Sequence, residues 1–434
     1  MAPTMRHVTF PYRGKTVDFD LPANSTIDIV TKEDVAPLPD VVSAARDALH
    51  HPIAAPRISE SVTPESRVLL LVDDWTRATP AHVLIPLVLA ELQQAGVSDA
   101  SISFLYATGQ HPAIWDHVVD KLGPGVVDRY PVTLHDAMQH ADHAFLGFTS
   151  LGTPVWVNKA VTAATYRIGI GGVQPNDTPG WSGGCKIIMP GVSGWETIKH
   201  THIKQLAAHR PDQYGSLENP IRRDIEEIGD LAGLNFILNV VWNRRLQVCH
   251  VVAGDPHEAW QQGLHVARRA FEYPVRTRSD IAIMYSEAAT YLSDAVFAAT
   301  RGFYLTKDGG TIVVVAPCSP TWASEEHLRV GRHWYPRKEW LRWSLGEITW
   351  KALRDEIPVR SSNYMAGFKF TTDRRHVVFV SDTNLADATR EIGADYKPSL
   401  HDALANAYRR YGETVHVILM PYDSNLIPVD EPST

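Results

Sequence analysis

The sequence lacks several features that would assign it to a specialised class of protein. Its 434 residues include only three cysteines, Cys185, Cys249 and Cys318, which are far apart and odd in number. This excludes a disulfide framework and favours a reducing cytoplasm. There is no apolar run of membrane-spanning length and no signal-peptide hydrophobic region near the N-terminus. We therefore expect a cytoplasmic protein with no membrane partner.

The chain also lacks an excess of basic charge. Its 41 lysines and arginines are outnumbered by 49 acidic residues, giving a net charge of −8, and there is no basic run or tail. A nucleic-acid partner is therefore not expected. Apolar residues make up 44% and charged residues 21%, as in ordinary globular proteins. The length allows two or three domains.

The first clear pattern is a strand, a helix and a second strand joined by short links. Residues 68–72 form a continuous apolar run, typical of a buried parallel strand. Thr79 is a suitable N-cap, with Pro80 at the first helical position, for a helix over 82–92. A second strand is predicted over 102–106. This βαβ unit predicts a parallel sheet.

Polar residues follow the strands, at the edge where open α/β sheets bind ligands. Asp74 and Arg77 follow the first strand. They could hold a hydroxyl and a carboxylate or phosphate, or they could simply be a helix-capping acid and a solvated arginine. His111 follows the second strand, where an imidazole suits acid–base chemistry, although most loop histidines are structural. A third strand over 166–173 should end in the same crevice.

That third strand leads into a glycine-rich loop containing one lysine. Gly183 and Gly184 would let the backbone approach a ligand, and Lys186 could bind a phosphate or form a covalent bond. Ile187 follows the lysine where a Walker motif needs serine or threonine, so an ordinary NTPase is disfavoured. The competing interpretation is a flexible surface loop.

Two histidines, His200 and His202, follow this loop. They would face the same way only on a strand or extended segment, whereas on a helix at most one could serve a given metal. Without a His-Glu-x-x-His motif or a cysteine pair, a standard zinc site is not expected. These residues alone indicate a metal or phosphate cofactor, without specifying a reaction.

A second α/β series begins near residue 276. We predict a cofactor-binding domain over 1–275, a second α/β domain over 276–412, and a segment 413–434 that could return to the first domain. The Trp-rich stretch 325–353 suits helices or a lid. The predicted fold is therefore a two-domain α/β protein with mostly parallel sheets and an active site in the interdomain cleft. The later strands are expected at 281–284, 311–315, 376–380 and 415–419, and helices at 294–301 and 403–411.

Taken together, several segments spread over nearly the whole chain resemble one family. Their order and spacing are similar to those of the nickel-dependent lactate racemase family of 2-hydroxy acid racemases and epimerases, and the joint match is specific although each segment alone is not. The segments are Asp74-x-Thr76-Arg77-x-x-Pro80, Ala107-Thr108-Gly109-x-His111, Gly180-x-Ser182-Gly183-Gly184-x-Lys186-x-x-x-Pro190-Gly191, Thr197-Ile198 with His202, Gly309-Gly310-Thr311-Ile312 and Val378-Phe379-Val380-Ser381-Asp382.

The resemblance implies a cofactor, the nickel pincer nucleotide, together with maturation enzymes that supply it. It implies a thioamide link from the cofactor to Lys186 and a nickel ligand at His202. His111 matches an acid–base histidine, and Arg77 matches a residue that contacts the substrate. The implied cofactor-binding residues are Asp74, Thr76, Gly183, Gly184 and Lys186.

The reaction implied by the resemblance inverts C2 of a 2-hydroxy acid. A base takes the hydroxyl proton while a hydride moves from C2 to the cofactor ring, which gives a transient 2-oxo acid. Return of the hydride to the opposite face completes the inversion.

One departure from the family concerns the second acid–base residue. Where lactate-type enzymes have a second histidine, this chain has Asn176, followed by Asp177. Asparagine cannot act as a general base near neutral pH, although it can orient a group. Asp177, His135 or His143 could supply the base, or the reaction could use one base, as in a dehydration or a net hydride transfer. The competing interpretation of residues 176–179 is a plain turn.

A second departure concerns the substrate pocket. Arg301 stands where the family has a carboxylate-binding lysine, and Phe297 and Ala298 replace a tyrosine and a glutamine. A different pocket argues against lactate itself and favours a larger 2-hydroxy acid or a sugar acid. The Trp-rich insert 334–350 could help shape this pocket. A non-catalytic cofactor-binding protein is the remaining alternative, disfavoured because a carrier needs neither His111 nor the arginines.

Overall fold

The computed structural model describes residues 4–12, 15–111, 114–207, 210, 213–286, 289–323, 339–412, 414–421 and 426–430. Contacts between Cα atoms divide the chain into two compact units. Unit N comprises residues 34–205 and 213–271, and unit C comprises residues 1–33, 206–212 and 272–434. The domain limits expected at 275 and 412 stay a prediction.

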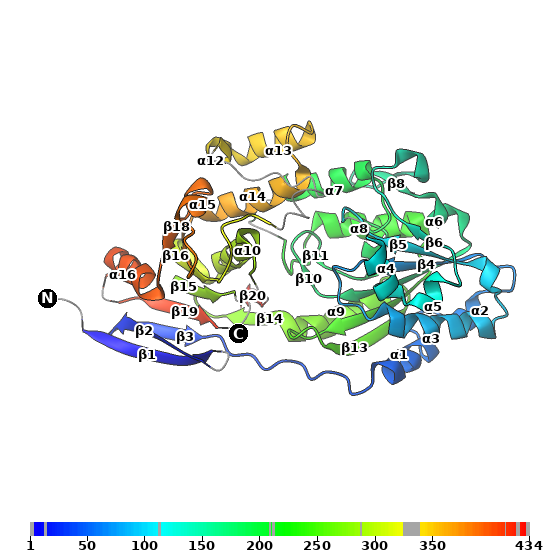
Figure 1. Cartoon of the computed structure of the whole chain (residues 1–434), viewed down its shortest axis with the longest axis horizontal. Helices are drawn as coiled ribbons and strands as arrows, with labels where there is room; N and C mark the ends of the chain where they lie inside the picture. The colour runs from blue at the N-terminus through cyan, green and yellow to red at the C-terminus, as the bar shows by residue number, and fades with distance from the viewer. Residues whose placement is uncertain are drawn as a thin grey trace. The chain divides into compact units, whose positions relative to one another are not determined.

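Unit N is built on a six-stranded sheet in which only the edge strand β13 is antiparallel to its neighbour (Figure 1). The predicted βαβ unit is confirmed, and the three strands expected to share an edge are neighbours in the order β9-β4-β5. Across the sheet the strands are β13 (Val248–Gly254), β12 (Phe236–Trp242), β9 (Tyr166–Val173), β4 (Val68–Asp73), β5 (Ile102–Ala107) and β6 (Val132–Leu134).

Helices cover both faces of this sheet. On one face, α1 (Val41–His50), α3 (Ala81–Gln94) and α4 (Trp115–Leu122) share a core with alternate residues of the strands. Leu84 and Leu70 in this core are fully buried, and such a side chain stabilises the fold by about 1.5–3 kcal/mol. Helix α9 (Glu258–Phe271) packs against β12 and β13, and α8 (Pro220–Ala232) packs against the segment carrying Lys186.

The predicted cap of α3 is wrong. The helix begins at Ala81, with Pro80 at the cap position, and Thr79 makes no cap hydrogen bond. Its hydroxyl instead donates to Oδ2 of Asp73 at 2.5 Å. The physical reason is that the carboxylate of Asp73 lies at the end of the buried strand β4 and needs a donor there.

Unit C contains a second six-stranded sheet, entirely parallel, in the order β18-β17-β16-β15-β19-β3. Residues 1–33 group with the C-terminal half of the chain because β3 pairs with β19 at the edge of this sheet. The strands are β18 (Asp395–Lys397), β17 (His376–Val380), β16 (Thr306–Val315), β15 (Ser279–Tyr285), β19 (His416–Met420) and β3 (Thr26–Ile29).

The sheet of unit C is also covered on both faces. The hairpin β1 (Met5–Tyr12) and β2 (Lys15–Pro22) packs with α16 (Leu400–Tyr411) into one core. On the other face, α10 (Leu292–Gly302) contacts β15, β16 and α14 (Val359–Thr372). The two-domain α/β fold with mostly parallel sheets is therefore confirmed.

The remaining elements are short or peripheral. The Trp-rich stretch lies partly outside the described residues, including Trp334, whereas Trp340 is buried and Trp350 is exposed. These elements are α2 (Ile58–Ser61), α5 (Pro124–Val127), α6 (Lys159–Ala163), α7 (Trp195–Ala207), α12 (Glu339–Arg342), α13 (Leu345–Leu353), α15 (Ala386–Glu391), β7 (His143–Phe148), β8 (Pro154–Asn158), β10 (Pro175–Asn176), β11 (Gly180–Trp181), β14 (Glu272–Val275) and β20 (Ile427–Asp430).

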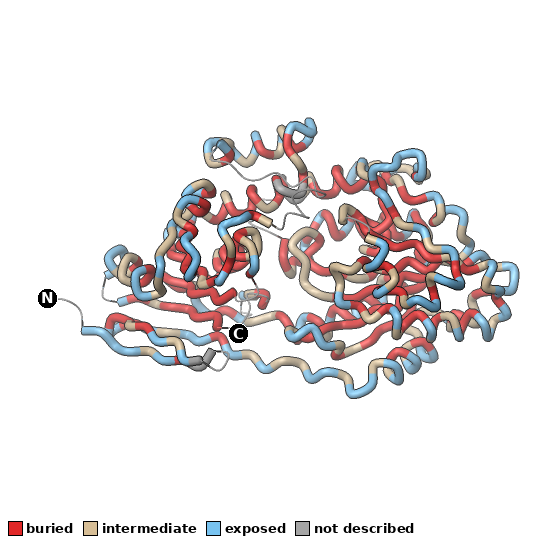
Figure 2. The backbone as a smooth tube through the Cα atoms, viewed as in Figure 1, coloured by how far each residue is buried: buried red, intermediate tan, exposed pale blue. Residues whose placement is uncertain are grey.

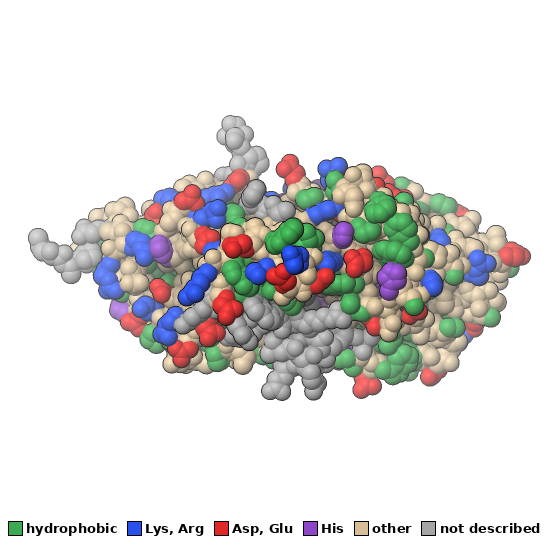
Figure 3. Space-filling view, turned by 90° about the horizontal axis from the view of Figure 1, so that it is seen from above, with side chains coloured by type: hydrophobic (Ala, Val, Ile, Leu, Met, Phe, Trp, Pro, Cys, Tyr) green, Lys and Arg blue, Asp and Glu red, His purple; other side chains and the backbone are tan. Residues whose placement is uncertain are grey.

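Apolar side chains and charged side chains are distributed differently over the fold. Buried residues follow the strands of both sheets (Figure 2). On the face drawn in Figure 3, side chains of both charges are interspersed among the described residues. No described helix combines the length and the hydropathy needed to cross a bilayer.

Candidate functional site

The ends of β4 and β5 bring Asp74 and His111 into contact. Nδ1 of His111 lies 2.5 Å from Oδ2 of Asp74, while the hydroxyl and amide of Thr76 donate to Oδ1 at 2.5 Å and 2.9 Å. Burial alone would raise the pKa of Asp74, but the hydrogen bond from His111 and the charge of Arg77 hold it well below its usual range. An ionised Asp74 accepts the proton on Nδ1, so Nε2 of His111 keeps the lone pair that a general base needs.

Arg77 lies on the loop that begins with Asp74. Its Nη1 donates to the carbonyl of Thr76 at 3.4 Å, and it forms no ion pair with a carboxylate in the part of the chain that is described. Its planar fork is therefore available for an anion.

A buried lysine stabilises the loop that carries Arg77. Lys121 of α4 donates to the carbonyl of Arg77 at 2.7 Å and lies 2.9 Å from Oδ1 of Asp73. Burial raises the pKa of Asp73, although Lys121 and Thr79 oppose this. Sequence reasoning missed Lys121, which stands 44 residues from Arg77 and belongs to no motif.

The glycine-rich loop is tightly packed, so its interpretation as a flexible surface loop is wrong. Gly183 and Gly184 have φ values of +83° and +59°, a region that favours glycine. The amide of Gly184 donates to Oδ1 of Asn239 on β12 at 2.9 Å. A Cβ atom on Gly184 would approach both Arg222 and Trp260 to 2.9 Å, so a side chain there would collide with the wall of the loop.

Two further glycines, both on β9, leave room for side chains that pack on the sheet. A Cβ atom on Gly169 of β9 would stand 2.9 Å from the side chain of Ile187, and one on Gly171 would stand 3.3 Å from Asp73. These glycines therefore serve close packing of backbone against side chain.

Lys186 emerges from this loop partly exposed. Burial and the nearby positive charge of Arg77 lower its pKa to about 7, although Asp74 opposes this shift. Its ammonium group has no hydrogen bond or ion pair with any described residue. A substantial fraction of Lys186 is thus a neutral amine near pH 7, the form that acts as a nucleophile.

His202 lies on α7 and is oriented by its own helix. Nδ1 lies 2.8 Å from the carbonyl of Ile198, which fixes the ring proton on Nδ1. Nε2 therefore carries a lone pair, and it lies 3.3 Å from the side-chain nitrogen of Gln110. A histidine that donates through one nitrogen to a carbonyl and presents the other is typical of a metal ligand. Gln110 directly precedes His111, so α7 contacts the loop that carries the acid–base candidate.

His200 diverges from His202, as expected on a helix. Two residues on an α-helix point about 200° apart. His200 is half-buried, and burial lowers its pKa. At most one of the two histidines can therefore face a common ligand.

Asn176 is the last residue of β10, and Asp177 begins the turn that leads to β11. Oδ1 of Asn176 accepts from the amide of Thr178 at 3.1 Å, and the carbonyl of Asp177 accepts from the amide of Gln213 at 3.0 Å. The interpretation of this segment as a turn is confirmed, and the catalytic roles of both residues stay predictions.

His135 and His143 are packed in the interior of unit N. They are 2% and 5% exposed, with ring centroids 5.4 Å apart. Nε2 of His135 donates to the carbonyl of Ser193 at 2.9 Å, and burial lowers the pKa of His135 to about 4. Their burial argues against either residue as a base for an external substrate.

Arg301 and Phe297 belong to α10 in unit C. Arg301 is 8% exposed, and its guanidinium carbon lies 5.8 Å from the ring centroid of Phe297. Phe297 also contacts Tyr364 edge to face at 4.9 Å. Their predicted contact with a substrate stays a prediction.

One further cluster in unit N has the composition of a metal site. Ligand atoms of Cys185, Glu226 and His257 lie within 4.8 Å of one another. Arg222 forms an ion pair with Glu226, and burial raises the pKa of the Cys185 thiol, so a cation is already present and the thiolate is disfavoured. The cluster is better explained as a buried charge network than as a metal centre.

Known proteins resemble this chain in sequence and in fold. A family model described as the lactate racemase N-terminal domain matches residues 12–213. A lactate racemase of Lactiplantibacillus plantarum is 26% identical over 380 residues, covering 86% of this chain and 88% of the relative. A lactate racemase of Thermoanaerobacterium thermosaccharolyticum is 26% identical over 342 residues, covering 75% and 78%.

Solved structures show the same fold. The lactate racemase apoprotein from T. thermosaccharolyticum superposes with a TM-score of 0.81 at 22% identity, covering 98% of this chain and 100% of that one. A protein from Thermotoga maritima gives a TM-score of 0.61 at 16% identity, covering 91% and 99%. Residues 12–213 thus match the lactate racemase N-terminal domain, and the chain as a whole is similar in sequence to two lactate racemases and has the fold of the T. thermosaccharolyticum apoprotein.

Proposed function

We propose that this protein is an isomerase that inverts C2 of a 2-hydroxy acid. The relatives support the reaction class, because both are named lactate racemase. The observation that carries the proposal is the setting of Lys186, an amine with a pKa of about 7 and no partner among the described residues, within electrostatic reach of Asp74 and Arg77.

The residues of unit N suit a nickel pincer nucleotide. Lys186 offers a neutral amine for covalent attachment, and Nε2 of His202 offers a lone pair for nickel. Gly183 and Gly184 keep side chains out of the loop beside Lys186, and Thr76 and Asp74 add polar groups. When bound, this group would supply the site that takes up the hydrogen of C2 and returns it.

The protein's own side chains would handle the proton and the substrate charge. Nε2 of His111 would take the proton of the C2 hydroxyl, and the ionised Asp74 would stabilise the imidazolium that results. Arg77 would bind the carboxylate with its guanidinium fork. The proposed base, His111, and the positively charged residue that would bind the carboxylate, Arg77, thus lie on the loops that follow the neighbouring strands β5 and β4.

A two-base reaction also needs an acid–base residue on the opposite face of the substrate. We propose that Asn176 orients the substrate and that Asp177 is the second base. A one-base reaction is the second candidate, and the observation that favours it is the hydrogen bond of Asn176 Oδ1 to the amide of Thr178, which uses this side chain in the turn.

The substrate is proposed to be larger than lactate, for example a sugar acid. The support is Arg301 with Phe297 on α10, because a planar guanidinium and a ring without a hydroxyl group offer a substrate different contacts from those of a lysine and a tyrosine. A higher kcat/KM for sugar acids than for lactate would support this, and the reverse order would contradict it.

The test uses protein co-produced with the cofactor-maturation enzymes and single enantiomers of 2-hydroxy acids labelled with deuterium at C2. Chiral chromatography should show inversion with the label retained, because the hydrogen returns from within the site. Loss of label to solvent would contradict the mechanism, and a 2-oxo acid or dehydrated product without inversion would favour the one-base reaction. His111→Gln should abolish turnover, whereas His82→Gln, at an exposed position of α3, should not.

A further inference from the structure

The peptide group between Gly183 and Gly184 is held at both of its polar atoms. Its carbonyl accepts from Nη1 of Arg222 on α8 at 3.1 Å, and its amide donates to Oδ1 of Asn239 on β12 at 2.9 Å. Both glycines have positive φ values, and a glycine backbone has more accessible conformations than that of any other residue. Side chains from two distant elements therefore fix the orientation of a peptide group that could otherwise rotate.

The same carbonyl connects this peptide group to Lys186. The amide of Lys186 donates to the carbonyl of Gly183 at 3.3 Å, at the start of the short 3-10 helix Gly184–Ile187. One oxygen therefore accepts both from the backbone of Lys186 and from the side chain of Arg222. A rotation of the peptide group would break both hydrogen bonds, so the backbone position of Lys186 depends on this orientation.

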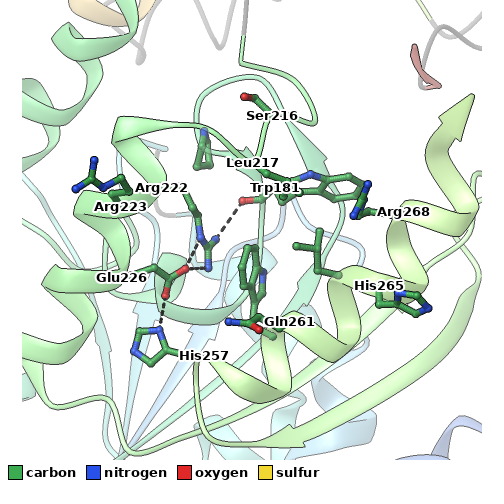
Figure 4. A pocket seen from close by; sticks show the side chains of 13 residues that line it. Trp181, Ser216, Leu217, Arg222, Arg223, Glu226, His257, Gln261, His265 and Arg268 are labelled. Carbon is green, nitrogen blue, oxygen red and sulfur yellow. Dashed lines mark hydrogen bonds and ion pairs between the residues drawn. The ribbon is translucent and has the colours of Figure 1, made fainter. Parts of the chain in front are cut away.

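Arg222 can hold the carbonyl because its guanidinium group is itself fixed. The residue is 5% exposed, and its guanidinium carbon lies 3.6 Å from the ring centroid of Trp260. It forms an ion pair with Glu226, which also lies 2.9 Å from Nδ1 of His257. It donates to the carbonyl of Trp181 at 3.3 Å as well. Figure 4 shows the contacts with Glu226 and Trp181 converging on this one group. A planar guanidinium can make these contacts together, whereas the single ammonium of a lysine cannot.

Asn239 is equally restricted at the other end of the peptide group. It belongs to β12 and is 2% exposed. A Cβ atom on Gly183 would approach Oδ1 of Asn239 to 2.9 Å, so the close approach of loop and strand requires glycine. An apolar side chain at position 239 would leave the amide of Gly184 buried without an acceptor, which is unfavourable.

The charge of Arg222 also acts on Lys186. Burial and the charge of Arg77 lower the pKa of Lys186, and the positive charge of Arg222 lowers it further. Arg77 follows β4 and Arg222 lies on α8, so two separate elements contribute to the same effect. Arg222 is thus linked to Lys186 both through a shared carbonyl and through its charge.

We infer that Arg222 and Asn239 are positioning residues, which clamp the peptide group between Gly183 and Gly184 and thereby hold Lys186 at the proposed site. The inference rests on the proposed function for what Lys186 does there. The clamp itself belongs to the protein alone, so it can be measured without cofactor and without turnover.

Hydrogen exchange of the cofactor-free protein, followed by mass spectrometry of peptides, tests the clamp. Asn239→Leu removes the acceptor of the Gly184 amide, so exchange within residues 180–187 should become about tenfold faster or more. Exchange within residues 68–73 of β4 should stay at the wild-type rate. Unchanged exchange within 180–187 would overturn the inference. Faster exchange in both segments would also overturn it, because Asn239 would then serve the fold as a whole.

The rate at which Lys186 is acylated in the same protein tests the effect on the lysine. Arg222→Gln should raise the pH midpoint of this rate, because a positive charge is lost and the released loop exposes the amine to water. At about pH 6 acylation should slow about threefold or more, the factor that corresponds to about half a pKa unit. Arg223→Gln changes an exposed neighbour on α8 and should leave the midpoint unchanged. A wild-type midpoint in Arg222→Gln would contradict the inference.

Arg222→Lys separates the charge of Arg222 from its hydrogen bonds. It keeps a positive charge but cannot hold Glu226 and both carbonyls, so exchange within 180–187 should rise while the midpoint of Lys186 lies below that of Arg222→Gln. Wild-type exchange in Arg222→Lys would reduce Arg222 to a source of charge and overturn the clamp. Failure of the proposed isomerase activity would leave all these results unchanged, and their failure would leave that activity untouched.

Discussion

His111 Nδ1 lies 2.5 Å from Oδ2 of Asp74, although the two residues are 37 positions apart. The other oxygen of Asp74 accepts two donors from Thr76. Both oxygens of the carboxylate therefore accept hydrogen bonds, which favours its ionised form, and the imidazole is held with Nε2 as its basic atom. In the proposed mechanism, this pair would handle the proton of the substrate's hydroxyl group.

Asp74→Asn should lower kcat by about 10² to 10⁴-fold, because the amide cannot stabilise an imidazolium at His111. The comparison requires protein with equal cofactor content, measured by intact mass. Asp128→Asn changes an exposed aspartate of the same unit and should leave kcat unchanged. A wild-type kcat for Asp74→Asn would remove Asp74 from the mechanism.

Lys186 in cofactor-free protein should react with an acylating reagent at a rate that rises with a midpoint near pH 7, because burial and Arg77 lower its pKa to about 7. An ordinary lysine has a midpoint near 10.4. Arg77→Gln should move the midpoint upward, since removal of a neighbouring positive charge makes the ammonium form less unfavourable. Arg46→Gln, an exposed change on α1, should not move it. Peptide mass spectrometry reads each lysine separately, and a wild-type midpoint near 10 would refute the shift.

Lys121→Met should lower the free energy of unfolding by about 3 kcal/mol, because it leaves the carboxylate of Asp73 buried without its cation. Urea denaturation followed by tryptophan fluorescence gives the value. Lys159→Met is a matched control, since Lys159 also donates to a carbonyl, that of Ala141, but is exposed, and its loss should cost less than about 1 kcal/mol.

The double variant Asp73→Asn/Lys121→Met should recover part of the stability lost in Lys121→Met, because no unpaired charge then remains. If the double variant is less stable than the single one by the full cost of Asp73→Asn alone, the two residues are not coupled.

His202→Gln should lower the nickel content of protein loaded in the producing cells, since it removes the proposed metal-binding nitrogen. His200→Gln, two residues earlier on the same helix, should retain nickel at the wild-type level. Nickel per chain is measured by mass spectrometry of the metal. Equal losses in both variants would indicate damage to α7 instead of loss of a ligand.

Local sequence patterns predicted much of the fold. The apolar run of β4, the strand β5 and the helix between them were predictable because their apolar periodicity and turn residues lie within about 40 consecutive positions. The cap of α3 was not predictable, because the hydroxyl of Thr79 makes a tertiary hydrogen bond to the carboxylate of Asp73 instead. The edge position of β3 could not be predicted from the sequence either, since its pairing with β19 joins residues almost 400 positions apart.

In the candidate site, too, local patterns in the sequence predicted some residues and long-range contacts determined others. Asp74, His111 and Lys186 could be selected from the sequence because they follow strand ends and match family motifs. The residues that hold them in position could not be selected in this way. Asn239, Arg222 and Lys121 hold the loops through long-range contacts, and no spacing in the sequence marks such partners. The structure therefore adds mainly the residues that orient the predicted ones.

The most direct test of the central claim is nickel content together with intact mass, on protein co-produced with the maturation enzymes. We predict close to one nickel per chain and a mass increment that maps to Lys186 and is lost in Lys186→Arg. The lactate racemase of L. plantarum, produced in the same cells, serves as the loading control. Absence of both nickel and the increment from folded protein, while the control is loaded, would contradict the account.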